Sequence, residues 1–264
     1  MDYKIAFFDM DHTLYESHED MIHQEDLAAI QLLRDQGVLI CAATGRPLNQ
    51  MNRILNYIKF DYLVLINGAY VLDGDYNIMY KNPIPQAEVN EIVNWTKQHH
   101  YPLSFHFGDQ SYIYWGAEEQ DSMWKRFNIT SGICKIDNPE YHLTHSAYNA
   151  IITADFEDMK GFLKKHEDLQ SCFIQEGTYD VYSKLNNKSL GIEYLLNHLN
   201  LTWNDTITFG DSTNDLEMLE KAKLGIAMEN GDELAKQCAN YVSDSIHHSG
   251  VAKAIHKILN HTLV

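Results

Sequence analysis

Two carboxylates stand together near the start of the chain, in the run Asp9-Met10-Asp11 that follows the apolar segment Ile5–Phe8. Residues two positions apart in an extended chain point to the same side, so both side chains would leave the end of a strand together. Two like charges a few ångströms apart raise one pKa unless a cation or hydrogen-bond donors intervene. The pair therefore indicates either a shared proton or a divalent metal, and a pair of helix N-cap residues is the structural alternative.

A second acidic cluster decides between these interpretations. The run Gly210-Asp211-Ser212-Thr213-Asn214-Asp215 follows the strand-like segment Thr206–Phe209, and neither cluster has a Lys or Arg nearby in the sequence. Two such clusters at strand ends would repel each other in one fold unless a hard cation bridged them. Magnesium is the natural candidate, because it prefers oxygen ligands and would cancel the repulsion that an acidic protein presents to a phosphate.

Two further features would complete a site for a phosphoryl group. Thr44-Gly45-Arg46 ends the strand-like segment Val38–Ala43 and offers a hydroxyl and a backbone amide near a helix start, where anions are favoured. Arg46 could contact a substrate or form a structural ion pair. Lys188 stands in the first turn of a predicted helix; a lone Lys is usually a solvated surface charge, but the other clusters favour a functional role.

The elements that must position these residues alternate between strands and helices. Apolar or β-branched runs predict strands, and helical spacing with Gly or Pro at the ends predicts helices between them. The strands are expected at Tyr3–Asp9, Val38–Thr44 and Tyr62–Ile66, and the helices at Gln24–Gln36 and Leu48–Tyr57. This order favours right-handed βαβ crossovers and a parallel sheet that is covered on both faces.

The alternation is interrupted in the middle of the chain and resumes at Ser189. A hairpin signal at Asp73-Gly74 precedes a segment in which strands and helices follow in another order. That segment is expected to contain the helices Ala87–His99, Glu118–Phe127 and Phe156–His166, and strands between and after them. The pattern indicates a separate α+β module inserted into the first one.

Composition excludes several classes of protein. The 264 residues include 20 Lys and Arg against 37 Asp and Glu, a net charge of −17 that would repel nucleic acid. A hydrophobic share of 45% excludes wholesale disorder. The four cysteines are widely spread and no run of about 18 apolar residues occurs, so we expect a cytoplasmic protein without a membrane segment.

Together, these residues resemble the four sequence motifs of the haloacid dehalogenase-like phosphatase superfamily. The matching positions are Asp9, Asp11 and Thr13, then Thr44, then Lys188, and finally Gly210, Asp211 and Asp215. Asn67-Gly68-Ala69 and other details resemble the Cof-type subfamily, whose α+β cap is inserted between the second and third motifs. Two departures stand out: Ser189 follows Lys188 where that subfamily often has Gly, and Glu229 follows the Met of Gly225–Met228 in place of a small residue.

With the alternation of elements, the resemblance implies an α/β fold with two domains. Residues 1–82 and 184–264 would form a Rossmann-like, doubly wound parallel-sheet core that carries the catalytic residues. Residues 83–183 would form the inserted α+β cap, which decides the leaving group.

The resemblance also implies a role for each site residue. Asp9 would be the nucleophile that forms an aspartyl-phosphate, and Asp11 the general acid and base. The phosphoryl oxygens would be held by Thr44 and Lys188 with help from Met10, Gly45, Arg46 and Asn214. Mg²⁺ would be bound by Asp9, Asp11 and Asp211, with Asp215 either a ligand through water or the residue that orients Lys188.

The implied activity is magnesium-dependent hydrolysis of a small phosphorylated metabolite, with sugar phosphates as the expected class. A phosphotransferase or phosphomutase that uses the same aspartyl-phosphate is the alternative. A non-catalytic phosphometabolite-binding protein is a third hypothesis, against which the presence of both Asp9 and Asp11 counts. We expect neither nucleic acid nor membrane as a partner, and a monomer or weak homodimer.

Overall fold

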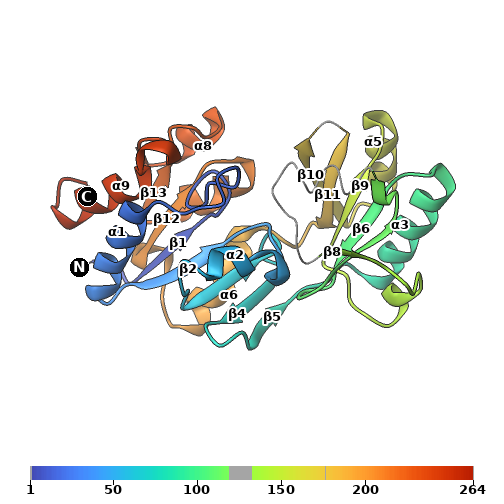
Figure 1. Ribbon diagram of the computed structural model, residues 1–264, viewed down its shortest axis with the longest axis horizontal. Coiled ribbons are helices and arrows are strands. Elements are labelled where there is room, and N and C mark those ends of the chain that lie inside the picture. The colour runs from blue at the N-terminus through green and yellow to red at the C-terminus, as the bar shows by residue number, and fades with distance from the viewer. Residues whose placement is uncertain (1, 119–132, 176, 264) are drawn as a thin grey trace. The chain divides into compact units, whose positions relative to one another are not determined.

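The computed structural model describes residues 2–118, 133–175 and 177–263. The chain divides into two compact units, each of which is described here by itself (Figure 1). The first unit comprises Met1–Gly45, Asn52–Tyr80 and Asn187–Val264, and the second comprises Arg46–Met51 and Lys81–Asn186. The predicted helix Glu118–Phe127 lies, apart from its first residue, outside the described residues.

The first unit is built on an eight-stranded sheet with the strand order β14-β13-β12-β1-β2-β3-β4-β5. Its strands are β1 (Ile5–Phe8), β2 (Leu39–Ala43), β3 (Tyr62–Leu65), β4 (Tyr70–Asp73), β5 (Ile78–Lys81), β12 (Thr206–Gly210), β13 (Leu224–Ala227) and β14 (Tyr241–Val242). Its helices are α1 (Gln24–Asp35), α2 (Asn52–Leu55), α6 (Lys188–His198), α7 (Leu216–Lys221), α8 (Glu233–Cys238) and α9 (Gly250–Leu259).

The strands from β14 to β3 all run parallel to their neighbours, and β4 is antiparallel to β3. Helices cover both faces of this sheet (Figure 1). On one face, Ile192 and Leu195 of α6 pack in a buried cluster with Ile5 and Phe7 of β1. On the other face, α1 and α9 lie side by side. The α/β class with a parallel-sheet core is therefore confirmed.

A buried carboxylate joins the two helices α1 and α9. Asp26 of α1 is fully buried, and its Oδ1 accepts a hydrogen bond of 2.7 Å from the backbone N–H of Ala252, in the first turn of α9. Among the described residues, its Oδ2 finds no hydrogen-bond partner. Burial raises the pKa of Asp26 from 3.8 to about 6, although the Ala252 N–H and the nearby His23 lower it.

This carboxylate makes the stability of the fold depend on pH. Between about pH 4 and pH 6 the folded chain keeps a proton on Asp26 that the unfolded chain has released, so the stability contributed by this group falls as the pH rises. Asp26→Asn keeps an oxygen for the Ala252 N–H but cannot ionise. In urea unfolding at pH 7, we expect the free energy of unfolding of the variant to exceed that of wild type by about 1–3 kcal/mol. This difference should vanish near pH 4, as the unfolded chain also takes up the proton on Asp26. Equal pH profiles for the two proteins would contradict this account.

The second unit has a six-stranded sheet with the order β10-β11-β9-β6-β7-β8. Its strands are β6 (Leu103–His106), β7 (Ser111–Trp115), β8 (Ile133–Lys135), β9 (Asn149–Thr153), β10 (Leu169–Gln175) and β11 (Thr178–Ser183), and its helices α3 (Gln86–His99) and α5 (Phe156–Lys165). Both helices pack on one face, where Ile92 and Phe162 join Phe105 and Val181 in one core. All pairs are antiparallel except β7 with β8. Strand β8 was not predicted from the sequence.

The predicted helix Leu48–Tyr57 is confirmed only in part. The structure has a single 3₁₀ turn at Leu48–Gln50, followed by the short helix α2. The turn belongs to the second unit, where the Leu48 N–H donates to the Gly108 carbonyl (3.3 Å) and Asn49 Nδ2 donates to Ser111 Oγ (3.0 Å). These tertiary hydrogen bonds override the local helical pattern, because propensity is a weak influence beside packing.

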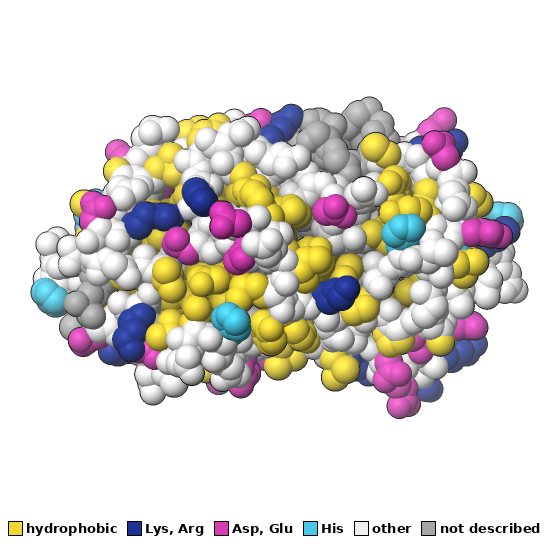
Figure 2. Space-filling view, turned by 90° about the horizontal axis from the view of Figure 1, so that it is seen from below, with side chains coloured by type: hydrophobic (Ala, Val, Ile, Leu, Met, Phe, Trp, Pro, Cys, Tyr) yellow, Lys and Arg dark blue, Asp and Glu magenta, His cyan; other side chains and the backbone are white. Residues whose placement is uncertain are grey.

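The face drawn in Figure 2 carries charges of both signs. On the face drawn in Figure 2, the Lys and Arg side chains are scattered among Asp, Glu and hydrophobic side chains. Among the described residues, every helix is too short or too polar to cross a membrane. The expected cytoplasmic location stays a prediction.

Candidate active site

Three neighbouring strands of the first unit end at the same edge of its sheet. Phe8 of β1 lies beside Ala42 of β2 and Phe209 of β12, and all three strands run in the same direction. The residues that follow them are therefore brought to one place, as is typical of ligand sites in open parallel sheets. Those residues include Asp9, Thr44 and Asp211, from three separate parts of the sequence.

Lys188 connects two of these loops. Its Nζ donates to Asp9 Oδ1 (2.5 Å) and to Asp215 Oδ1 (2.6 Å), and all three side chains are buried. Lys188 is the first residue of α6, and the preceding Asn187 caps that helix by accepting from the Leu190 N–H (2.8 Å). The N-cap fixes where α6 begins and so places Lys188 at the edge of the sheet.

The loop after β12 is organised by Asp215. Its Oδ2 accepts from the backbone N–H groups of Asp211 (3.0 Å) and Ser212 (3.1 Å), while Oδ1 accepts from Lys188. Asp211 in turn accepts from Thr13 Oγ1 (3.0 Å), which ties this loop to the loop after β1. Asp215 thus holds the Asp211 backbone and the Lys188 ammonium at once. Thr13 belongs to the first motif but was not among the predicted site residues.

Burial changes the proton affinity of these groups. Burial raises the pKa of Asp9 well above its usual range; attraction to Lys188 opposes this, and repulsion from Asp215 and Asp211 adds to it. Burial and repulsion from Asp215 raise the pKa of Asp211 to about 7. Burial alone would lower the pKa of Lys188, but attraction to Asp215 and Asp9 outweighs it and raises the pKa, so Lys188 stays charged.

These carboxylates fit a bound divalent cation. Asp9, Asp211 and Asp215 are buried, and each offers an oxygen that lies within 4.8 Å of the others'. One ammonium group, Lys188, contacts two of the three acids, so the ionised cluster would keep a net negative charge in a buried place. An all-oxygen donor set of this kind suits Mg²⁺.

The turn between β3 and β4 supplies a residue that the sequence analysis missed. Ile66, Asn67 and Gly68 all have positive φ (49°, 49° and 87°), a conformation that costs energy for a β-branched residue such as Ile66. The turn brings Asn67 Oδ1 within reach of Asn214, whose Nδ2 donates to it (3.0 Å). A Cβ built on Gly45 would lie 3.3 Å from the same oxygen. Asn67-Gly68-Ala69 was noted only as a detail that resembles the Cof-type subfamily, but Asn67 lies beside Gly45 and Asn214, two of the predicted phosphate-binding residues.

The remaining predicted residues have different surroundings. Met10 is fully buried, and its carbonyl accepts backbone hydrogen bonds from Thr13, Leu14 and Tyr15, so it shapes the loop after β1. Asp11 in that loop is partly exposed. Arg46 belongs to the second unit, where its guanidinium donates to the Gln50 carbonyl (3.1 Å).

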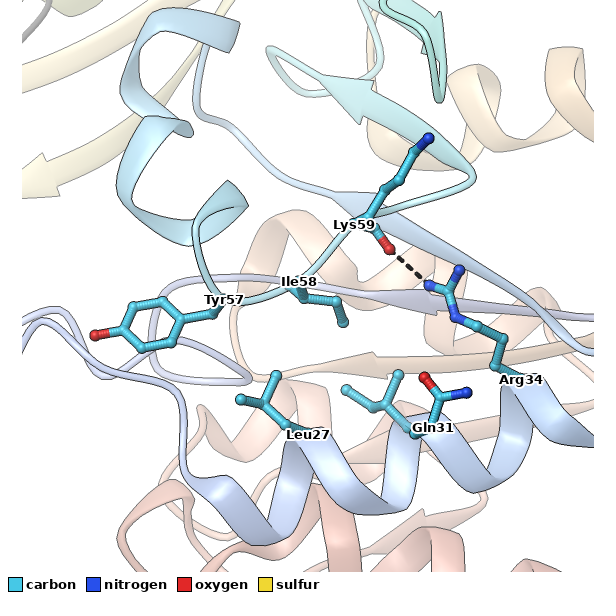
Figure 3. A pocket seen from close by; sticks show the side chains of 7 residues that line it. Leu27, Gln31, Arg34, Tyr57, Ile58 and Lys59 are labelled. Atoms are coloured by element: carbon cyan, nitrogen blue, oxygen red, sulfur yellow. Dashed lines mark hydrogen bonds between the residues drawn. The ribbon is translucent and has the colours of Figure 1, made fainter.

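A hollow of about 320 Å³ elsewhere on the first unit contains none of these residues (Figure 3). Leu27, Ile30 and Ile58 supply its apolar wall, and Arg34 donates to the Lys59 carbonyl (2.6 Å) beside it. Arg34 is thus already engaged by the protein, and the described residues that line the hollow include no carboxylate that could bind a metal. The cluster around Lys188 is therefore the candidate active site.

Comparisons with known proteins show what this chain is similar to. The family model for haloacid dehalogenase-like hydrolases matches residues 6–255. A Bacillus subtilis relative, named 5-amino-6-(5-phospho-D-ribitylamino)uracil phosphatase, is 24% identical over 97% of this chain and 95% of its own length. The HMP-PP phosphatase of Yersinia pseudotuberculosis is 30% identical over 89% of this chain and 87% of its own.

Two further comparisons extend this picture. A longer relative from Streptococcus pyogenes is 25% identical over 97% of this chain, which spans only 54% of that protein. A solved structure described as a HAD subclass IIB sugar phosphatase superposes with a TM-score of 0.86 and 26% identity, over 97% of this chain and 98% of that one.

Proposed function

This chain belongs to the haloacid dehalogenase-like hydrolase family, and we propose that it is a magnesium-dependent phosphomonoesterase that acts on a small phosphorylated metabolite. The observation that carries the proposal is the buried cluster in which Lys188 bonds both Asp9 and Asp215 beside Asp211. Acids from two strand ends and one buried lysine meet where a parallel sheet binds ligands.

In the first step, a carboxylate oxygen of Asp9 attacks phosphorus in line with the ester oxygen. The bond from phosphorus to the leaving oxygen breaks, and an aspartyl-phosphate forms on Asp9. Asp11 gives its proton to the departing alkoxide. Asp11 is partly exposed and two residues from Asp9, so its side chain can exchange protons with solvent between turnovers.

In the second step, a water molecule attacks the same phosphorus and Asp11 takes its proton. The bond between phosphorus and Asp9 breaks, so that free phosphate leaves and Asp9 is restored as a carboxylate. One difficult displacement is thereby divided into two easier ones.

The chain's own donors hold the phosphoryl oxygens during both steps. Lys188 supplies a fixed positive charge, and its ion pairs with Asp9 and Asp215 set its direction before substrate arrives. The Thr44 hydroxyl, the backbone amides of Met10 and Gly45, and the Asn214 amide complete the cradle. The hydrogen bond from Asn214 to Asn67 fixes the orientation of that amide.

The metal would be held by Asp9, Asp11 and Asp211, and when bound it supplies positive charge that offsets the phosphate and the acid cluster. Both oxygens of Asp215 already accept hydrogen bonds from the protein. This supports the alternative in which Asp215 orients Lys188 and the Asp211 backbone, in preference to direct metal binding.

We further propose that the second unit, the predicted cap, selects the leaving group. The strand registers align Tyr182, Asn149, His106 and Ser111 in one row across four of its strands. Burial lowers the pKa of His106 to about 3, so the imidazole is neutral and hydrogen-bonds to Ser111 Oγ (2.5 Å). A row of neutral donors and acceptors suits hydroxyl groups, which supports a sugar phosphate as the substrate class, as in the solved sugar phosphatase.

A phosphate-release assay tests this function. Wild-type protein is given sugar phosphates, nucleotides and pyridoxal phosphate, each with Mg²⁺ and with a chelator. We expect phosphate release that requires Mg²⁺ and is fastest with a sugar phosphate. Conversion of a sugar phosphate to an isomer without release of phosphate would instead establish phosphoryl transfer, and turnover that persists in chelator would exclude the proposed metal dependence.

A further inference from the structure

The two residues that flank Lys188 share one partner, the carboxylate of Glu217. Asn187 Nδ2 donates to both of its oxygens (3.1 and 3.2 Å), and Ser189 Oγ donates to Oε2 (2.7 Å). The backbone on either side of Lys188 is therefore tied to a single side chain.

Glu217 is close to the site in sequence as well as in space. It is the second residue of α7 and follows Asp215, the buried partner of Lys188, by two positions. Two sets of contacts therefore connect the start of α6 with the start of α7. One is the buried Lys188–Asp215 pair, and the other is the set of hydrogen bonds that the more exposed Glu217 accepts from Asn187 and Ser189.

The contact with Glu217 explains a departure noted in the sequence. The Ser189 hydroxyl makes this contact, and a Gly at this position could not make it. Lys221 Nζ donates to Ser189 Oγ (3.1 Å) and lies 3.5 Å from Glu217 Oε2. Ser189 Oγ accepts from Lys221, and its one proton has two acceptors within reach: Glu217 Oε2 at 2.7 Å and Asn187 Oδ1 at 3.0 Å. The charged and nearer Glu217 oxygen is the stronger acceptor. The buried Ser189 hydroxyl and the partly exposed side chains of Glu217 and Lys221 form one charge-assisted group beside Lys188.

The first turn of α6 is also packed closely against the backbone of the turn between β3 and β4. A Cβ built on Gly68, which has φ +87°, would lie 2.0 Å from the Asn187 carbonyl oxygen. A Cβ built on Gly191 would lie 2.7 Å from the Gly68 Cα. The start of α6 is thus packed against the turn between β3 and β4 on one side and held by Glu217 on the other.

We propose that Glu217 is a positioning residue: by bonding Asn187 and Ser189, it fixes the first turn of α6 so that the Lys188 ammonium stays directed at the reacting phosphoryl group. The inference rests on the proposed function, in which Lys188 holds that group. Glu217 is 54% exposed, so its loss changes global stability little. Its effect is on the rate, because a small misplacement of a binding group costs catalysis more than stability.

The kinetic test compares Glu217→Ala with Glu220→Ala, an exposed acid on the same helix. We expect Glu217→Ala to lower kcat about 5- to 20-fold with a smaller change in KM and an unchanged unfolding midpoint. Glu217→Gln should recover part of the loss, because its amide oxygen can still accept one of the bonds. Wild-type kcat in Glu217→Ala, or an equal loss in Glu220→Ala, would overturn the inference.

A double-mutant cycle separates this contact from general damage. Ser189→Ala removes one arm of the contact, and we expect the double variant Ser189→Ala with Glu217→Ala to be no slower than Glu217→Ala alone. Effects that simply multiply would show that the two residues act independently and would overturn the inference.

A second readout does not depend on activity. Brief treatment with acetic anhydride, followed by mass spectrometry of peptides, measures how fast Lys188 is acetylated relative to Lys223 on the surface. Glu217→Ala should raise the rate at Lys188 several-fold, because the buried ammonium leaves its partners more often. Suppose that wild type releases no phosphate from any tested phosphate ester, but that Lys188 is acetylated faster in Glu217→Ala than in wild type. The proposed function then fails and the positioning role of Glu217 stands. If acetylation is unchanged, the positioning role fails.

Discussion

Asp9→Asn should abolish phosphate release from every substrate that the wild-type protein hydrolyses, by about three orders of magnitude or more. The amide has nearly the same shape as the carboxylate but cannot attack phosphorus. The fold should tolerate the change, because the amide fills the same space and its oxygen can still accept the hydrogen bond from Lys188 Nζ. Lys188 keeps its second partner, Asp215. The measurement is phosphate release with Mg²⁺, together with urea unfolding of both proteins.

A matched control separates loss of the nucleophile from loss of charge. Asp75 is 84% exposed and pairs with Lys59 at 3.9 Å, so Asp75→Asn makes the same chemical change in the same unit without touching the site. It should retain wild-type turnover. Turnover by Asp9→Asn at a rate comparable to wild type would exclude the aspartyl-phosphate mechanism, whatever the substrate.

Lys188→Met should reduce both activity and stability strongly. The Lys188 side chain is 1% exposed, and its removal leaves Asp9 and Asp215 buried without their cation. Removing one partner of a buried ion pair costs about 3–5 kcal/mol, because the remaining charge is uncompensated. Methionine fills much of the same space, so the loss would not be one of packing. Urea unfolding and phosphate release measure the two effects.

The cause of this loss can be tested within the site. If uncompensated charge is responsible, adding Asp9→Asn to Lys188→Met should restore part of the unfolding free energy, because one buried carboxylate is then neutral. Lys59→Met, at a lysine that is 74% exposed, should change stability by no more than about 1 kcal/mol. If the double variant instead loses as much unfolding free energy as the two single variants together, the loss would come from a packing defect and not from uncompensated charge.

The sequence by itself predicted the fold class and the position of most acids relative to the strands. Ile5–Phe8 is apolar and Thr206–Phe209 is entirely β-branched or aromatic, and a carboxylate or glycine follows each run. Such a pattern is local, so it can be recognised without knowing what the strand contacts. That parallel strands end at one edge then follows from the alternation of strands and helices, which is why Asp9 and Asp211 could be expected to approach each other.

The local pattern failed where a distant part of the chain sets the conformation. Leu48–Tyr57 has helical spacing, but Leu48 and Asn49 bond Gly108 and Ser111, some 60 residues further along. Asn67 is an ordinary turn residue in the sequence. Its side chain reaches Asn214 only because residues 66–68 all adopt positive φ values.

Tertiary structure alone decided which polar groups pair within the site. Thr13 bonds Asp211 across 198 positions, Lys188 bonds Asp9 across 179, and Glu217 bonds the residues on either side of Lys188. Residue type shows that each of these groups can donate or accept, but not which partner lies within hydrogen-bond distance of it. That choice depends on how helices α6 and α7 pack on the sheet, because a hydrogen bond requires both distance and direction, and packing sets both.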